Sequence, residues 1–108
     1  MTYEVYITQE ILDNPLVDPS CPYNCAIAEA LNLQDPDVPT WVDIDTIFSG
    51  EPGDECESYM SELLIEWHDN YMRTGTAEPI TIIIDGDVCY IKGKERYDHT
   101  TDWEVIPL

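Results

Sequence analysis

The chain has 108 residues, of which 44% are hydrophobic, and it carries 23 acidic side chains against 4 basic ones. This hydrophobic share is too high for a disordered acidic tail, and the length suits one domain, so we expect a single folded domain over residues 1–108. The formal net charge of -19 argues against direct binding to nucleic acids or anionic membrane surfaces, because both are polyanions.

The negative charge is concentrated in the first 91 residues, which contain 19 acids and one base, Arg73. The other bases are Lys92, Lys94 and Arg96, within the five positions that follow. Because like charges repel in a compact fold, this imbalance opposes folding and needs an explanation. A strongly basic partner is one explanation, and we then expect the three clustered bases to face away from it.

Signals for export and membrane insertion are missing from the sequence. The N-terminus lacks the basic region and apolar core of a secretory signal, and no apolar run approaches the length of a membrane span. We therefore expect a cytoplasmic protein without membrane association, in which the cysteines are reduced.

The first predicted elements are a strand and two helical segments. Residues 3–7 alternate in polarity, which predicts a half-buried strand with its odd-numbered side chains inside. Thr8 is a candidate N-cap for a short helical turn. A helix is then expected to start after Ser20, because residues 26–31 are rich in good helix formers.

Two later segments predict single strands. Residues 41–48 alternate in polarity, and Asp43 and Asp45 lie on the face that we expect to be exposed to water. Residues 103–106 predict a last edge strand.

A β-hairpin is predicted near the end of the chain. Residues 80–84 and 88–91 are strongly apolar and flank Asp85, Gly86 and Asp87. An Asp-Gly pair between two such segments is one of the strongest hairpin signals.

The longest helix is predicted for residues 55–73, with Gly75 as its stop signal. Its apolar side chains recur every three or four residues, which is typical of a helix with one buried face. That stripe consists of Cys56, Met60, Leu63, Leu64, Trp67 and Tyr71. A second row, along one flank, is acidic and consists of Glu55, Glu62, Glu66 and Asp69. Ile65 and Met72 lie outside both rows and are expected to be exposed, and His68 is expected at the surface.

Together these elements predict an α+β fold with the order β-α-β-α-β-β. The two helices are expected to pack on one face of a mostly antiparallel sheet.

Residue types that catalyse reactions or bind metals form no recognisable motif here. The cysteines are Cys21, Cys25, Cys56 and Cys89, and the histidines are His68 and His99. The cysteines lack the Cys-x-x-Cys spacing of a zinc knuckle, so reduced core thiols are favoured over a zinc site. The sequence has no nucleophile motif, phosphate loop or dinucleotide fingerprint. We expect neither enzymatic activity nor a cofactor.

The amount of charge predicts a function. At one charge per about 1.7 Å of duplex axis, 19 charges correspond to about 32 Å of DNA. A compact domain of this length is about 34 Å across, so its linear charge density matches that of DNA. We therefore expect a nucleic-acid mimic that binds a basic protein. The expected contact residues are Glu55, Glu62, Glu66, Asp69, Asp43, Asp45, Asp85 and Asp87, with Ile65, Met72, Tyr59 and Tyr71 as apolar anchors.

Residues 7–10 (Ile-Thr-Gln-Glu), followed by Cys21-Pro-Tyr-Asn-Cys-Ala-Ile-Ala-Glu-Ala-Leu31, resemble a pattern in small phage and prophage proteins. In these proteins a TQE start leads to a helix of the form C-x-x-x-C-A-I-A-x-A-L, and no activity carries over from them. In charge and size the chain also resembles phage-encoded DNA mimics, including anti-CRISPR and anti-restriction proteins. That resemblance implies an inhibitor, in the cytoplasm of the bacterial host, of a nucleic-acid-binding defence complex such as a CRISPR effector.

Two alternative functions stay open from the sequence. One is an acidic protein adapted to a salt-rich cytoplasm, which would need molar KCl to fold. The other is a small metal-binding or regulatory module that uses the cysteines, which elemental analysis for zinc would reveal.

Overall fold

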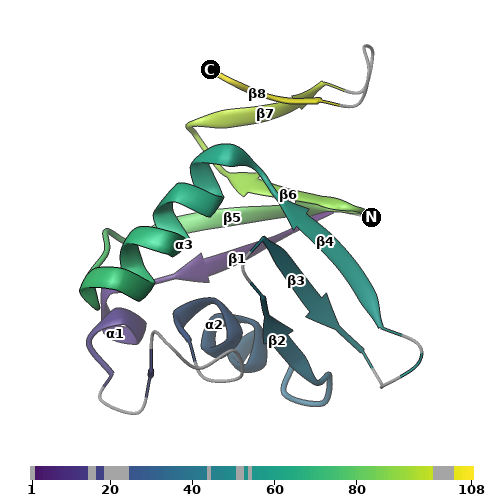
Figure 1. The fold of residues 1–108 in the computed structure, drawn as a ribbon. Helices are drawn as coiled ribbons and strands as arrows, with labels where there is room; N and C mark the ends of the chain where they lie inside the picture. The colour runs from purple at the N-terminus through teal and green to yellow at the C-terminus, as the bar shows by residue number, and fades with distance from the viewer. Residues whose placement is uncertain are drawn as a thin grey trace.

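The structure is a computed structural model that describes residues 2–14, 17–18, 25–43, 45–50, 53, 55–98 and 104–108. Within these residues the chain forms helices and strands in a mixed order (Figure 1). They are β1 (Thr2–Ile7), α1 (Gln9–Leu12), α2 (Ala26–Gln34), β2 (Thr40–Val42), β3 (Thr46–Ser49), β4 (Cys56–Met60), α3 (Glu62–Thr74), β5 (Ile80–Asp85), β6 (Val88–Ile91), β7 (Glu95–Asp98) and β8 (Glu104–Pro107).

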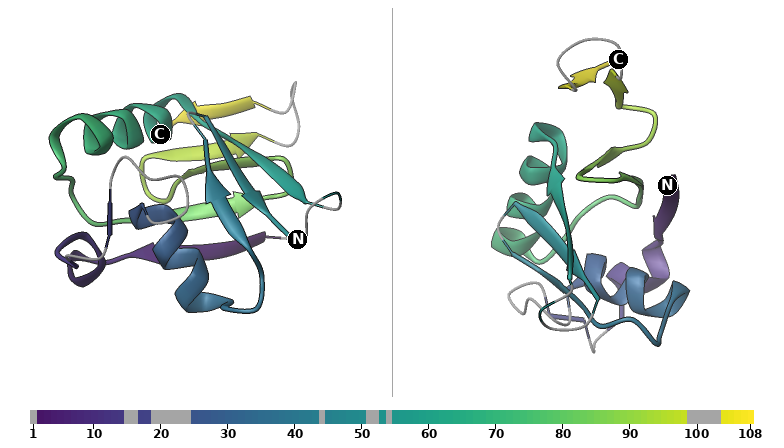
Figure 2. Two further views of the ribbon diagram at one scale, coloured as in Figure 1. Left: turned by 60° about the horizontal axis from the view of Figure 1, so that its bottom comes forward. Right: turned by 90° about the vertical axis from the view of Figure 1, so that its right-hand side faces the viewer.

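Six of these strands form one twisted sheet in the order β1-β5-β6-β4-β3-β2. Every neighbouring pair is antiparallel except β4 and β6, which run parallel. The parallel pairing is possible because α3 and β5 lie between these strands in the chain and return it to the same end of the sheet. β7 and β8 form a separate antiparallel hairpin, which Figure 2 shows beyond β6 at one end of the molecule.

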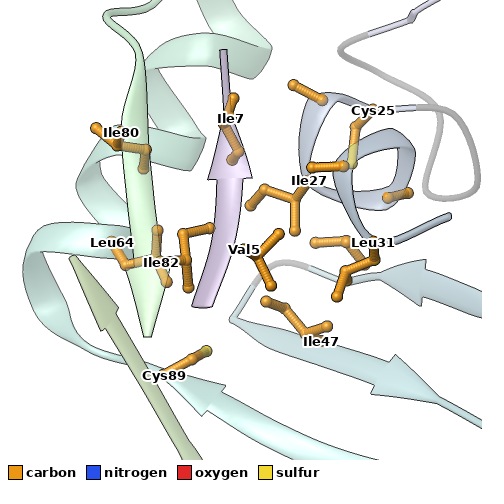
Figure 3. Packing of buried hydrophobic residues seen from close by; sticks show 14 of the residues in the cluster. Val5, Ile7, Cys25, Ile27, Leu31, Ile47, Leu64, Ile80, Ile82 and Cys89 are labelled. Atoms are coloured by element: carbon orange, nitrogen blue, oxygen red, sulfur yellow. The ribbon is translucent and has the colours of Figure 1, made fainter. Parts of the chain in front are cut away.

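One face of the six-stranded sheet supplies the strand side of the hydrophobic core. Val5 pairs with Ile82, and Ile82 pairs with Ile91, so these buried side chains share that face. Both longer helices add their buried residues to the same core cluster, through Ile27 of α2 and Leu64 of α3. Figure 3 shows Val5 with Ile27 on one side and Ile82 on the other.

The predicted α+β class, with a mostly antiparallel sheet, is confirmed. The strand over residues 3–7 is present, with Val5 and Ile7 buried and Tyr6 exposed. The Thr8 side chain caps α1 by accepting a hydrogen bond from the backbone of Ile11, at 3.3 Å. The hairpin of β5 and β6 turns at Gly86, whose φ of 60° is a left-handed conformation that favours glycine.

The prediction of one strand over residues 41–48 is wrong, because the chain turns back within it. β2 and β3 form an antiparallel hairpin in which Val42 pairs with Ile47. The backbone N–H of Asp43 donates to the carbonyl of Thr46 at 2.9 Å and closes the turn. Asp43 and Asp45 therefore flank a turn and do not line a strand face, which agrees with the poor fit of aspartate to strands.

The prediction of one helix over residues 55–73 is also wrong in its first third. Cys56–Met60 form β4, and α3 begins only after Ser61, whose side chain caps it by accepting from the backbone of Leu64 at 3.3 Å. Cys56 is consequently exposed and belongs to no helical stripe. The helix ends at Gly75, as predicted.

Three side chains of α3 that the sequence predicts to be exposed are buried or half-buried in the structure. His68 is buried, with 2% of its surface exposed, because it lies one turn after Leu64 on the stripe that faces the core. Ile65 is half-buried and packs against the core, and Met72 is half-buried as well.

The expected start of the first long helix, after Ser20, lies outside the described residues. In the described part α2 begins at Ala26, with Cys25 as its N-cap. Cys21 and His99 also lie outside the described residues, as does Trp103. The last strand is present as β8, but its partner β7 was not expected.

Candidate partner-binding surface

The acidic side chains lie overwhelmingly at the surface. Among those that the structure describes, the exceptions are Glu4, Glu29 and Asp85, which are half-buried, and Glu95, which is buried. Only one of the described carboxylates is therefore buried, and most of the others are exposed to water. Their mutual repulsion is a cost that the fold itself does not offset.

The acidic row on the long helix is shorter than expected. Glu62, Glu66 and Asp69 are all exposed on α3, and their spacing of four and three residues places them on one flank. Glu55 precedes β4 and is not part of this helix. Ile65 is a poor anchor for a partner because it packs against the protein's own core.

The structure brings two of the predicted aspartates together around Tyr59 of β4. The backbone N–H of Tyr59 donates to the carbonyl of Asp87 at 2.7 Å, and that of Met60 donates to the carbonyl of Asp45 at 2.8 Å. Asp45 and Asp87 stand at the start of β3 and β6, the two strands that flank β4. Two separate turns thus place Asp45 and Asp87 on the two strands beside Tyr59, and the charges of both act on its hydroxyl.

The environment of Tyr59 is strongly negative. Its hydroxyl donates to the carboxylate of Glu57 at 2.9 Å, and 52% of the residue surface is exposed. This hydrogen bond is the main cause that raises the pKa of Tyr59, and the charges of Asp45 and Asp87 raise it further. We call Asp45, Glu57, Tyr59 and Asp87 the Tyr59 surface.

Asp85 and Asp87 extend this negative region toward the C-terminal hairpin. Burial is the main cause that raises the pKa of Tyr97 in β7, and the charges of Asp85 and Asp87 raise it further. The predicted aspartates therefore gather near the start of β3 and β6, and they do not prolong the row on α3. The sequence predicts Tyr59 as an anchor, but its place beside two aspartates depends on strand pairing that the sequence alone does not specify.

The described lysines are each neutralised by a carboxylate. The ammonium of Lys92 lies 2.6 Å from Glu4, and that of Lys94 lies 2.5 Å from Glu78. The hydrogen bond from Lys92 is the main cause that lowers the pKa of Glu4. Both lysines line a depression of about 560 Å³, but their ion pairs leave little positive charge there for an anion.

A buried polar cluster lies where α3 begins. Glu95 of β7 accepts a hydrogen bond from Ser61, and the Cys89 thiol lies 3.7 Å from the carbonyl of Ser58. Burial, with a smaller effect of Glu95, raises the pKa of Cys89 to about 12. A thiol that stays protonated is a poor nucleophile, so this cluster has the properties of a structural contact.

The cysteines described here occupy separate places in the fold. Cys25 is buried at the N-cap position of α2, Cys56 is the exposed first residue of β4, and Cys89 is buried in β6. In the ranges that the structure describes, no group of three or more histidine, cysteine or acidic side chains is placed to hold a metal ion. No helix in those ranges is long and apolar enough to cross a membrane.

Comparisons of this chain with protein-family models, with curated proteins and with solved structures find no match.

Proposed function

We propose that this protein is a phage-encoded inhibitor of a host defence nucleoprotein, of the anti-CRISPR type. It acts as an acidic nucleic-acid mimic that occupies a basic DNA- or RNA-binding surface, and it acts by binding without catalysis. The observation that carries the proposal is the Tyr59 surface, where Asp45 and Asp87 from two separate turns flank one exposed tyrosine. Lys92 and Lys94 are each paired with one carboxylate, so they balance only a small part of the charge of the 23 acidic side chains.

The dimensions of the molecule support the comparison with DNA. Its longest extent is 42 Å, and its charge of -19 corresponds to about 32 Å of duplex at one charge per about 1.7 Å. The protein therefore presents a charge density of the same order as a short duplex. A partner channel lined with lysine and arginine to grip phosphates meets a similar number of carboxylates here.

The chemistry of the Tyr59 surface suits arginine in particular. Carboxylates bind a guanidinium through paired, charge-assisted hydrogen bonds, and a tyrosine ring attracts a cation over its face. Asp45 and Asp87 provide the first interaction, and the exposed ring of Tyr59 provides the second. Long-range attraction between the net charges speeds the encounter and makes it sensitive to salt.

The experiment begins with capture of a partner from a bacterial host lysate on the immobilised protein at low salt. A captured nucleic-acid-binding protein is then tested for binding to labelled duplex DNA with and without this protein. We expect the DNA to be displaced, and the inhibition to weaken steeply as salt is added. Failure to recover any nucleic-acid-binding protein, or DNA binding that persists at saturation, would overturn the proposal.

Charge-reversal variants locate the contact. Asp45→Lys combined with Asp87→Lys changes the Tyr59 surface, and a matched control combines Asp35→Lys with Asp37→Lys in the exposed loop after α2. Both double variants change the net charge equally, so only a specific contact distinguishes them. We expect the Tyr59 variant to lose inhibition and the control to retain most of it. Equal losses would mean that total charge, and no particular surface, produces the inhibition.

The row on α3 requires its own variant. Glu62→Lys, Glu66→Lys and Asp69→Lys together reverse its charge without touching the core, because all three side chains are exposed. We expect a loss of inhibition with an unchanged circular dichroism spectrum. Full inhibition by this variant would show that α3 is not part of the contact with the partner. The Tyr59 surface would then be the only proposed contact.

A further inference from the structure

A groove lies between α1, α2 and the edge strand β1, and none of its lining residues belongs to the Tyr59 surface or to the acidic row on α3. Its volume is about 370 Å³, at the small end of the range for pockets that bind ligands. Its exposed apolar lining comes from Tyr6 and Leu33, because the other two apolar residues that line it, Ile11 and Ala30, are buried. Glu10 and Glu29 add two carboxylates to the lining.

The apolar lining of this groove is unusually open to water. Leu33 is 63% exposed and Tyr6 is 52% exposed, which makes them two of the most exposed large hydrophobic side chains in the described residues. Leu33 lies on a different side of α2 from Ile27, which is fully buried in the core. Tyr6 faces away from the core, and its hydroxyl donates to Glu4 at 2.7 Å. Neither Tyr6 nor Leu33 belongs to the hydrophobic core, so core packing does not explain why these positions are apolar.

The groove is unsuited to binding a partner by strand addition. The side chain of Gln34 accepts a hydrogen bond from the backbone N–H of Tyr6 at 3.1 Å and donates to the carbonyl of Glu4 at 2.8 Å. These are two of the backbone groups that an added strand would need at this edge, so Gln34 blocks strand addition there. An occupant must therefore bind through its side chains.

Charge selects the kind of occupant. The lining of the groove contains Glu10 and Glu29 and no basic residue. A second copy of this chain would bring a further charge of -19, so electrostatic repulsion opposes self-association here. An apolar floor with acidic sides complements a segment that carries both aliphatic and cationic side chains.

We propose that this groove binds a basic amphipathic segment of the partner. An aliphatic side chain of that segment packs between Tyr6 and Leu33, and its lysine or arginine neighbours pair with Glu10 and Glu29. The proposal rests on the proposed function only for the basic character of the partner. Binding in this groove supplies an apolar contact between the two proteins. Such a contact is needed because exposed ion pairs by themselves contribute little to the free energy of binding.

The test uses the full chain, labelled with ¹⁵N, and a short synthetic peptide of alternating arginine and leucine. We expect the amide signals of α2 and of Tyr6 to shift most on titration. A peptide in which serine replaces leucine should bind at least about tenfold more weakly, since it retains only the charge. Shifts that spread evenly over the acidic surface, or that centre on Tyr59, would overturn the proposal.

Two leucine variants provide the matched control. Leu33→Ser removes the apolar side of the groove, and Leu108→Ser removes an exposed leucine at the C-terminal end, where 73% of the residue is exposed. We expect Leu33→Ser to weaken peptide binding about tenfold and Leu108→Ser to leave it within about twofold. Equal affinities of the two variants would overturn the assignment of the groove.

The outcomes separate this inference from the proposed function. If Leu33→Ser still binds the peptide normally while the Asp45 and Asp87 reversal abolishes inhibition, the inference about the groove is contradicted. The proposed function as a nucleic-acid mimic is then still supported. If the groove binds the peptide but the protein displaces no DNA from a basic partner, the proposed function as a mimic is contradicted. The inference that the groove binds a basic amphipathic segment is then still supported. Concentration-dependent dimers that Leu33→Ser abolishes would instead assign the groove to a second copy.

Discussion

The hydroxyl of Ser61 donates a hydrogen bond to the carboxylate of Glu95 at 2.5 Å, and both residues are buried. Ser61 is the N-cap of α3, and Glu95 is the first residue of β7. This contact therefore fastens the C-terminal hairpin to the start of the helix. The partial positive charge of a helix N-terminus also favours a carboxylate at this place.

Replacement of Glu95 by alanine should destabilise the protein. Hydrogen bonds to charged groups contribute about 1.5–3 kcal/mol, and the loss leaves a buried serine hydroxyl without its acceptor. We expect the free energy of unfolding, measured by urea denaturation, to fall by an amount in this range. Glu95→Gln should recover part of the loss, because its amide oxygen can still accept.

The matched control for that experiment is Glu78→Ala. Glu78 is exposed and pairs with Lys94 at the surface, where such ion pairs contribute about 0–1 kcal/mol. If Glu78→Ala cost as much stability as Glu95→Ala, the anchoring role of Glu95 would be contradicted.

The described cysteines should differ sharply in reactivity. Cys56 is exposed, whereas Cys89 is buried with a pKa of about 12. At pH 8 a pKa of about 12 leaves roughly one Cys89 thiol in ten thousand ionised, and burial also blocks access of the reagent. We expect iodoacetamide to modify Cys56 rapidly and Cys89 only after denaturation, as followed by tandem mass spectrometry that assigns each modified cysteine. Early modification of Cys89 in the native protein would show that β6 opens locally.

High pH should weaken the fold through its tyrosines. Burial raises the pKa of Tyr71 above its usual value of 10.0, and burial likewise raises that of Tyr90. Because the folded state holds these protons more tightly than the unfolded state, their contribution to stability is complete below about pH 10 and is lost above it. We expect phenolate absorbance to appear above pH 10 together with the loss of the circular dichroism signal. Normal titration of all tyrosines without any structural change would contradict this prediction.

Removal of the Gln34 amide should expose the edge of β1. Gln34→Leu deletes two hydrogen bonds to the backbone of this strand, and each contributes about 0.5–1.5 kcal/mol. We expect lower stability and, at high salt, self-association that light scattering detects, because screening removes the repulsion between copies. Gln9→Leu is the control, since Gln9 bonds to Asp13 through its side chain and leaves the edge covered. Association of both variants alike would point to added hydrophobicity as the cause.

Local signals in the sequence predicted those parts of the fold that depend on neighbouring residues. Asp85-Gly86 predicted the hairpin because the turn needs a left-handed residue, and Thr8 predicted a cap because its hydroxyl reaches the third residue onward. Residues 56–60 were misassigned because Cys56 and Met60 fit a helical stripe as well as a strand. Ser61 was the missed signal, since a serine before Glu62 is typical of a helix start.

The Tyr59 surface and the groove could not be predicted in the same way. Asp45 and Asp87 are 42 positions apart in the chain and lie near the same tyrosine because β3 and β6 both pair with β4. No local pattern specifies which strands become neighbours. Leu33 likewise fits either side of a helix until the packing of Ile27 and Leu31 shows which side of α2 is buried.

The pairing of β1 with β5 has a consequence for biosynthesis. Val5 meets Ile82 across 77 positions, so β1 is translated well before β5 and cannot pair with it until β5 has been made. Until then its apolar residues and backbone groups have no permanent partner, and contacts of such long range also slow folding. The repulsion between the many carboxylates of the nascent chain keeps it apart from other chains during this interval, and in this way the charge protects the protein before it folds.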